Sequence, residues 1–186
     1  MPDLSLARRS PLERFAAGRG AALTALPAAT RFVLRGRPAA IDAAEAAFGQ
    51  TLPRTACRAT QTERRAALWL GPDEWLMLAP DDEAAPLFAT LTEAIGAAPH
   101  SLVDVSHRQV AIEVSGPDVE AVLNTGCPLD LSLDEFPVGM CTRTIFGKSE
   151  IVLWRTSAAG FRVEVWRSFA AYVWRMLEEA GREFRV

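Results

Sequence analysis

Residues 101–130 read SLVDVSHRQVAIEVSGPDVEAVLNTGCPLD, and this stretch decides how the rest of the chain is interpreted. Apolar side chains alternate with other residues over 110–114, which is the period of a strand with one buried face. The strand stops at Gly116. Pro117 then suits the first turn of a helix, because its missing N–H would be unpaired there. The stretch predicts a short strand, a turn, a second strand and a helix over 117–124.

A weak internal repeat organises the chain around this stretch. Residues 31–36 match residues 110–116 as a strand that ends in glycine, and short helices are predicted to follow at 41–48 and 117–124. The second part of each repeat is predicted to be a hairpin and a longer helix, at 66–70, 75–79 and 82–95 in the first repeat and at 150–154, 161–166 and 168–179 in the second. The same order of strand, helix, hairpin and helix is therefore predicted twice.

Hairpins separated by helices indicate a mixed, largely antiparallel sheet with helices packed on it. We predict an α+β fold made of two duplicated halves, the first at residues 31–98 and the second at 99–186, packed as one compact unit. Residues 1–30 are expected to be a loose or partner-bound N-terminal arm, because their proline and glycine residues discourage regular structure. His100 follows Pro99 and is expected to lie in a solvated connecting loop.

Composition excludes several classes of protein. The chain has 186 residues, of which 49% are hydrophobic, and a formal net charge of -3. This balance indicates a folded domain and no nucleic-acid partner, and no apolar run is long enough to cross a bilayer. Cys57, Cys127 and Cys141 are an odd, widely separated set without a C-x-x-C pair, which best fits a reduced protein of the cytoplasm.

The sequence offers little material for catalysis or metal binding. His100 and His107 are the only histidines, which excludes a histidine-rich metal site, and no spacing supports a mixed Cys/His zinc site. Asp104, Ser106 and His107 are too close in sequence to converge as a triad, so we expect Asp104 and Ser106 to bond backbone groups at a strand-to-turn junction. No phosphate-binding glycine motif is present. We therefore predict no catalytic, cofactor-binding or metal-binding residues in this chain.

Trp166 is the one candidate for an interface residue. The apolar residues of the predicted strand 161–166 share one face, which places Trp166 with Arg162 and Glu164 on the opposite, more polar face. A large aromatic side chain in that position needs cover. A helix of the same chain or a partner subunit could supply it, and the sequence leaves both alternatives open.

Three segments carry a resemblance to a known family. Val103–His107, Ser115–Asp118 and Cys127–Asp130 resemble the gamma subunit of heterotetrameric sarcosine oxidase, a relative of the folate-binding aminomethyltransferases. The resemblance implies a folate-binding-domain-like fold, similar to the N-terminal part of an aminomethyltransferase, in which two halves surround a central groove. It also implies a non-catalytic subunit that supports assembly with the alpha, beta and delta subunits.

The resemblance implies the chemistry of the whole complex as well. Such a complex demethylates sarcosine oxidatively to glycine, transfers the one-carbon unit to tetrahydrofolate and forms hydrogen peroxide. FAD, FMN, NAD, tetrahydrofolate and zinc are then expected in the other subunits and none in this chain. Transferases of the related family keep an aspartate after the turn that corresponds to residues 147–150, but Glu150 here is more simply the exposed start of a strand.

Two other functions stay open at this stage. The chain could be a free-standing folate-dependent one-carbon transferase or a folate-binding regulatory protein that uses the central groove. It could also be an interaction module of a different amine-oxidising complex. Neither nucleic acid nor a membrane is expected as a partner.

Overall fold

Two five-stranded antiparallel sheets run through the computed structural model, which describes residues 10–13, 15 and 22–184. The first sheet has the order β3 (Ala59–Gln61), β4 (Ala66–Gly71), β5 (Glu74–Pro80), β2 (Ala29–Gly36), β6 (His100–Asp104). The second has the order β8 (Cys141–Phe146), β9 (Ser149–Ser157), β10 (Gly160–Trp166), β7 (Gln109–Ser115), β1 (Ala22–Ala25). The predicted α+β class is confirmed. The sheet was predicted to be mixed and largely antiparallel, whereas the structure has two separate sheets whose strand pairs are all antiparallel.

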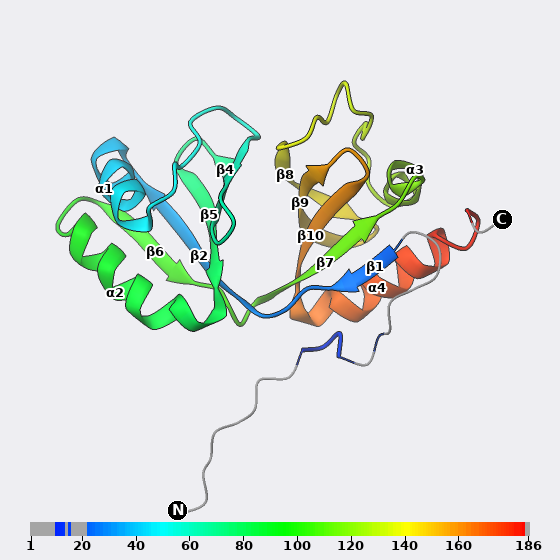
Figure 1. Cartoon of the computed structure of the whole chain (residues 1–186), viewed down its shortest axis with the longest axis horizontal. Helices are drawn as coiled ribbons and strands as arrows, with labels where there is room; N and C mark the ends of the chain where they lie inside the picture. The colour runs from blue at the N-terminus through cyan, green and yellow to red at the C-terminus, as the bar shows by residue number, and fades with distance from the viewer. Residues whose placement is uncertain (1–9, 14, 16–21, 185–186) are drawn as a thin grey trace, which may run out of the picture.

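The helices cover the outer faces of the two sheets. In Figure 1, α1 (Pro38–Phe48) and α2 (Ala84–Ile95) lie on the first sheet, whereas α3 (Val119–Asn124) and α4 (Arg167–Ala180) lie on the second. A short 3₁₀ turn, η1 (Asp81–Glu83), leads into α2. The molecule therefore has four layers in the order helices, sheet, sheet, helices.

Each layer boundary has its own apolar core. Phe32 and Leu34 of β2 pack with residues of α1 and α2, and Ile112 and Val114 of β7 pack with residues of α3 and α4. A third cluster joins the two sheets and contains Ala66, Leu68, Leu76, Leu78, Val105, Cys141, Val152 and Trp154. Because successive strand residues point to opposite faces, the central strands are apolar on the helix side and also contribute to contacts between the sheets.

One edge strand of each sheet comes from outside the predicted half that supplies the other strands of that sheet. β1 precedes the first predicted half but pairs with β7, with Leu23 opposite Val114. β6 begins the second predicted half but pairs with β2 of the first sheet. The boundaries predicted at residues 31–98 and 99–186 therefore do not coincide with the two sheets.

The prediction that residues 1–30 form a loose or partner-bound arm is wrong for residues 22–25 and 29–30, and also for Leu12, which is 1% exposed in the core beneath the second sheet. Ala22–Ala25 form β1, and Leu23 is almost fully buried in the core beneath the second sheet. Pairing with the free edge of β7 satisfies the backbone of this segment, and burial of its leucine adds a hydrophobic contribution. The predictions for residues 1–9, 14 and 16–21 lie outside the described residues.

Smaller differences concern loops and helix ends. His100 was expected in a solvated loop, but it is the half-buried first residue of β6, opposite Gly36 of β2. The helix predicted from Pro117 begins at Val119. Within the part of the chain that the structure describes, no helix is both long and apolar enough to cross a membrane.

Candidate functional site

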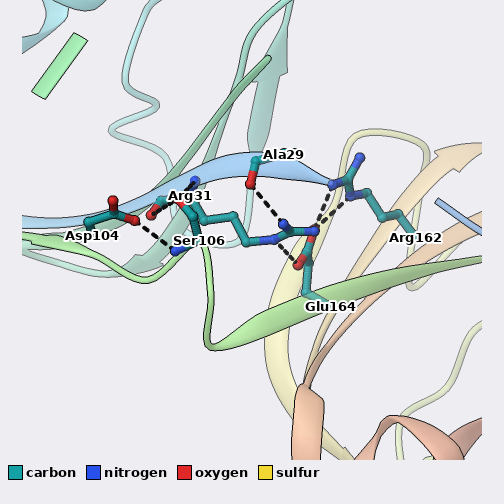
Figure 2. Close-up of polar contacts among 6 residues, drawn as sticks. All are labelled: Ala29, Arg31, Asp104, Ser106, Arg162 and Glu164. Atoms are coloured by element: carbon teal, nitrogen blue, oxygen red, sulfur yellow. Dashed lines mark hydrogen bonds and ion pairs between the residues drawn. The ribbon is translucent and has the colours of Figure 1, made fainter. Parts of the chain in front are cut away.

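A buried ion pair connects the two sheets. Arg31 lies on β2, on the face opposite the helices, and its side chain reaches Glu164 of β10 (Figure 2). Arg31 Nε donates to Glu164 Oε2 at 2.6 Å, and Arg31 Nη2 donates to Oε1 at 3.2 Å. Both side chains are 1% exposed. The two residues are 133 positions apart in sequence, so this contact forms only when the two sheets pack.

A second arginine also binds the carboxylate of Glu164. Arg162 donates to Glu164 Oε1 through Nε at 2.9 Å and through Nη2 at 2.7 Å. Burial by itself would raise the pKa of Glu164, but the charges of Arg162 and Arg31 and their hydrogen bonds outweigh it and hold this pKa below its usual value. Glu164 is therefore ionised and fully engaged at neutral pH, which makes it unsuitable as a general acid or base.

The turn after β6 is fixed next to this ion pair. The backbone N–H of Ser106 donates to Asp104 Oδ1 at 2.8 Å, and the N–H of Arg31 donates to Ser106 Oγ at 2.9 Å (Figure 2). His107 is exposed. The predicted backbone-bonding role of Asp104 and Ser106 is confirmed, and these side chains position a turn.

Trp166 lies where β10 passes directly into α4. It is the last residue of the strand and the N-cap residue of the helix, so its backbone is fixed from both sides. The predicted face is confirmed, because Phe161, Val163 and Val165 belong to the helix-side core and Arg162 and Glu164 point away from it. Trp166 is 40% exposed, and the Arg108 guanidinium lies 5.3 Å from the centroid of its indole ring.

A groove of about 270 Å³ opens between the two sheets beside Trp166. Its apolar wall comes from Val33, Leu70, Leu76, Ile151 and Val152, and its polar lining from Arg108, Gln109, Arg143 and Glu150. Arg143 donates to both carboxylate oxygens of Glu74, which occupies that guanidinium. Gln109 is 6% exposed, and its Oε1 has no hydrogen-bond partner among the described residues.

The described residues provide no metal centre: no three His, Cys, Asp or Glu side chains among them are placed to hold an ion together. Burial raises the pKa of the Cys141 thiol to about 12. That thiol is therefore protonated at neutral pH and is neither a nucleophile nor a good ligand. Glu150 is an exposed residue at the start of β9, as expected.

Comparisons with known proteins define the class of this fold and then its family. Over 83% of this chain and 44% of the other, the structure matches aminomethyltransferase T of the glycine cleavage system from Bartonella henselae, with a TM-score of 0.61 and 14% identity. That likeness shows a shared fold. A chain of heterotetrameric sarcosine oxidase from Corynebacterium sp. U-96, in complex with pyrrole 2-carboxylate, matches with a TM-score of 0.88 and 31% identity over 96% of this chain and 97% of that one.

Sequence comparisons agree with this assignment. The model of the sarcosine oxidase gamma subunit family matches residues 35–183. Sarcosine oxidase subunit gamma from Corynebacterium sp. strain P-1 is 34% identical over 95% of this chain and 91% of its own length. The same subunit from an Arthrobacter species is 33% identical over the same shares. The chain belongs to the sarcosine oxidase gamma subunit family, which confirms the resemblance found in its sequence.

The sequence predicted the strand face on which Trp166 lies, but it did not predict the residues around it. Arg31 was assigned only to a strand, and its pairing with Glu164 has no local signal, because the residues belong to different halves. Arg108 and Gln109 directly follow His107 at the end of the turn. Gln109 begins β7, and only the strand register places it opposite Trp166, the last residue of β10.

Proposed function

We propose that this chain is the non-catalytic gamma subunit of a cytoplasmic heterotetrameric sarcosine oxidase and supports its assembly with the alpha, beta and delta subunits. The observation that carries this proposal is the match to a chain of the heterotetrameric enzyme over nearly the full length of both chains. The buried Arg31–Glu164 pair supports a rigid scaffold, because it ties the two sheets together without leaving a free acid or base.

In the proposed complex, sarcosine is oxidised to glycine by flavin. The methyl carbon passes to tetrahydrofolate as a methylene group, and the two electrons reduce oxygen to hydrogen peroxide. FAD, FMN, NAD, tetrahydrofolate and zinc belong to the other subunits in this proposal. The gamma chain contributes structure and no reacting group, which agrees with a protonated Cys141 thiol and a Glu164 carboxylate held by two arginines.

We also infer that the two halves are a duplicated unit of a folate-binding-domain-like fold. β2 and β7 occupy the same position in the two sheets, each between a hairpin strand and an edge strand. The hairpins β4–β5 and β9–β10 also correspond, as do the outer strands β3 and β8. This matching order supports a repeat of one ancestral unit around the groove.

Trp166 is proposed as an anchor for a larger subunit. Partly exposed tryptophans beside arginine are typical anchors of protein interfaces, and Trp166 is 40% exposed next to Arg108. Replacing Trp166→Ala should weaken assembly by about 1–3 kcal/mol and leave the fold of the free chain nearly unchanged. The measurement is the dissociation constant of the purified chain with the co-expressed larger subunits, beside circular dichroism of the free variant.

The conservative variant Trp166→Phe is the matched control and should retain part of the affinity, because an aromatic ring still fills the site. Assembly of Trp166→Ala with unchanged affinity would contradict the interface role. Unfolding of the free variant would instead show that the indole is needed within its own chain.

Equilibrium binding separates this function from its main alternative. A free-standing folate-dependent transferase or a folate-binding regulatory protein should bind tetrahydrofolate stoichiometrically without other subunits. We expect the free chain to show no saturable binding by isothermal titration calorimetry, and the assembled complex to bind through another subunit. Stoichiometric binding to the free chain would favour the alternative.

A further inference from the structure

We propose that the groove beside Trp166 receives a segment of a larger subunit that presents one carboxylate side chain and one free main-chain N–H. The carboxylate pairs with Arg108, and the N–H donates to Oε1 of Gln109. This inference rests on the proposed assembly function and adds the chemistry of the partner segment. Two adjacent residues define this chemistry: Arg108 requires a hydrogen-bond acceptor, and Oε1 of Gln109 requires a donor.

Arg108 supplies the requirement for an acceptor. Its guanidinium is held 5.3 Å from the centroid of Trp166, and it forms no ion pair with a carboxylate of the described residues. Arg143, which also lines the groove, is in contrast paired with Glu74. An arginine that stacks on an aromatic ring keeps its N–H donors at the rim of the stack, where they match the two oxygens of a carboxylate.

Gln109 supplies the requirement for a donor. It lies opposite Trp166 in the pairing of β7 with β10, so both side chains project from the same face of the sheet. Gln109 is only 6% exposed, and its Oε1 lacks a donor among the described residues. Buried polar atoms are nearly always hydrogen-bonded. A main-chain N–H of a segment lying in the groove would satisfy this carbonyl.

The size and rim of the groove favour a polypeptide over a small molecule. Its volume of about 270 Å³ lies just below the range of about 300–1,000 Å³ typical of small-molecule pockets, and it suits one or two inserted side chains. Val103 and Ile145 are 48% and 49% exposed. They are opposite Val33 and Glu150, two residues of the groove lining, in their strand pairings. With Trp166 they add exposed apolar surface next to the groove, of the kind that interfaces bury.

The test uses the full chain assembled with the larger subunits of the oxidase. Arg108→Glu should weaken association at least tenfold, because it places a negative charge against the proposed carboxylate. Arg37→Glu is the matched control, since it makes the same charge change at the exposed start of α1 and should change affinity less than twofold. Circular dichroism of each free variant checks the fold.

The Gln109→Leu variant distinguishes a role in binding from a role in the fold, because the two roles predict different changes in stability and in dissociation rate. Removing the unpartnered oxygen should leave the free chain equally or more stable, while the complex dissociates at least threefold faster. A photo-reactive benzoylphenylalanine at position 166 should cross-link to one peptide of a larger subunit that contains Asp or Glu, identified by mass spectrometry.

The outcomes separate this inference from the function on which it rests. If the wild-type chain does not associate with the larger subunits at all, the proposed function fails. If it associates but Arg108→Glu behaves like Arg37→Glu, or position 166 cross-links only within its own chain, the inference fails alone. A small anion retained by the native wild-type complex and lost from Arg108→Glu would also overturn it, because the occupant would then not be a polypeptide.

Discussion

Arg31 and Arg155 are both almost fully buried, at 1% and 0% exposure, but they are neutralised in different ways. Arg31 pairs with Glu164, a carboxylate as buried as itself, and the pair joins the two sheets. Arg155 of β9 instead donates mainly to backbone oxygens, including those of Leu131 at 2.8 Å and Phe136 at 3.0 Å. The first arginine fixes the arrangement of the two sheets, and the second fixes the loop at residues 131–136 and the turn between β9 and β10.

The carboxylate partner of Arg155 underlines this difference. Arg155 pairs with Glu120 of α3, whose side chain is 38% exposed, and its guanidinium lies 4.8 Å from the centroid of Phe161. Water can replace Glu120, but it cannot reach Glu164. Buried ion pairs are expensive to form and costly to break from one side, so the comparison predicts very different costs for the removal of these two glutamates.

The largest effect is expected for Glu164→Ala. The change leaves Arg31 buried without a counter-charge and removes the partner of Arg162, so the free energy of unfolding should fall by about 3–5 kcal/mol. Urea unfolding of the free chain, followed by circular dichroism, measures this loss. A cost below about 1 kcal/mol would show that the pair behaves like a surface ion pair and would remove the distinction between the two arginines.

A smaller effect is expected from acid. The pKa of Glu164 lies below its ordinary value in the folded chain, so its contribution to stability is fully present above the unfolded-state pKa and is lost as pH falls through the folded-state pKa. We expect the stability difference between the wild type and Glu164→Gln to be constant near neutral pH and to shrink steadily below about pH 4.5. Urea titrations over this range measure it, and a difference that grew in acid would contradict the assigned direction.

Sequence patterns predicted most of the secondary structure because most of the strands and helices carry their own periodicity. Residues 110–114 and 161–165 alternate, and the hairpins carry turn residues between them, so β7, β10 and the hairpin strands were found in place. β1 was missed because four residues in a chain segment rich in Ala, Pro and Gly give no period. Its strand state comes from the edge of β7, which local sequence does not contain.

The site was predictable only in part, for a related reason. The polar face of β10 was recognised, but a polar strand face normally indicates solvent. Here Glu164 is buried because a second sheet packs on that face, and the pairing with Arg31 depends on how the sheets meet. Trp166 could be named from its strand alone. The groove beside it could not, because its lining comes from strands of both sheets.

The smallest effect is expected for Glu120→Ala, and this variant tests the comparison most directly. Glu120 is 38% exposed, so the guanidinium of Arg155 keeps its backbone acceptors and gains water where the carboxylate was. The cost should be about 0–1 kcal/mol, against the several kcal/mol expected for Glu164→Ala.

The matched control removes the arginine of the same ion pair. Arg155→Met leaves the Leu131 and Phe136 carbonyls without a donor, and the loss of stability should be about 1–3 kcal/mol for each carbonyl. Urea unfolding of both variants measures the two costs. A loss for Glu120→Ala as large as that for Arg155→Met would mean that the carboxylate, and not the loop backbone, neutralises this buried arginine, and the two arginines would then be alike.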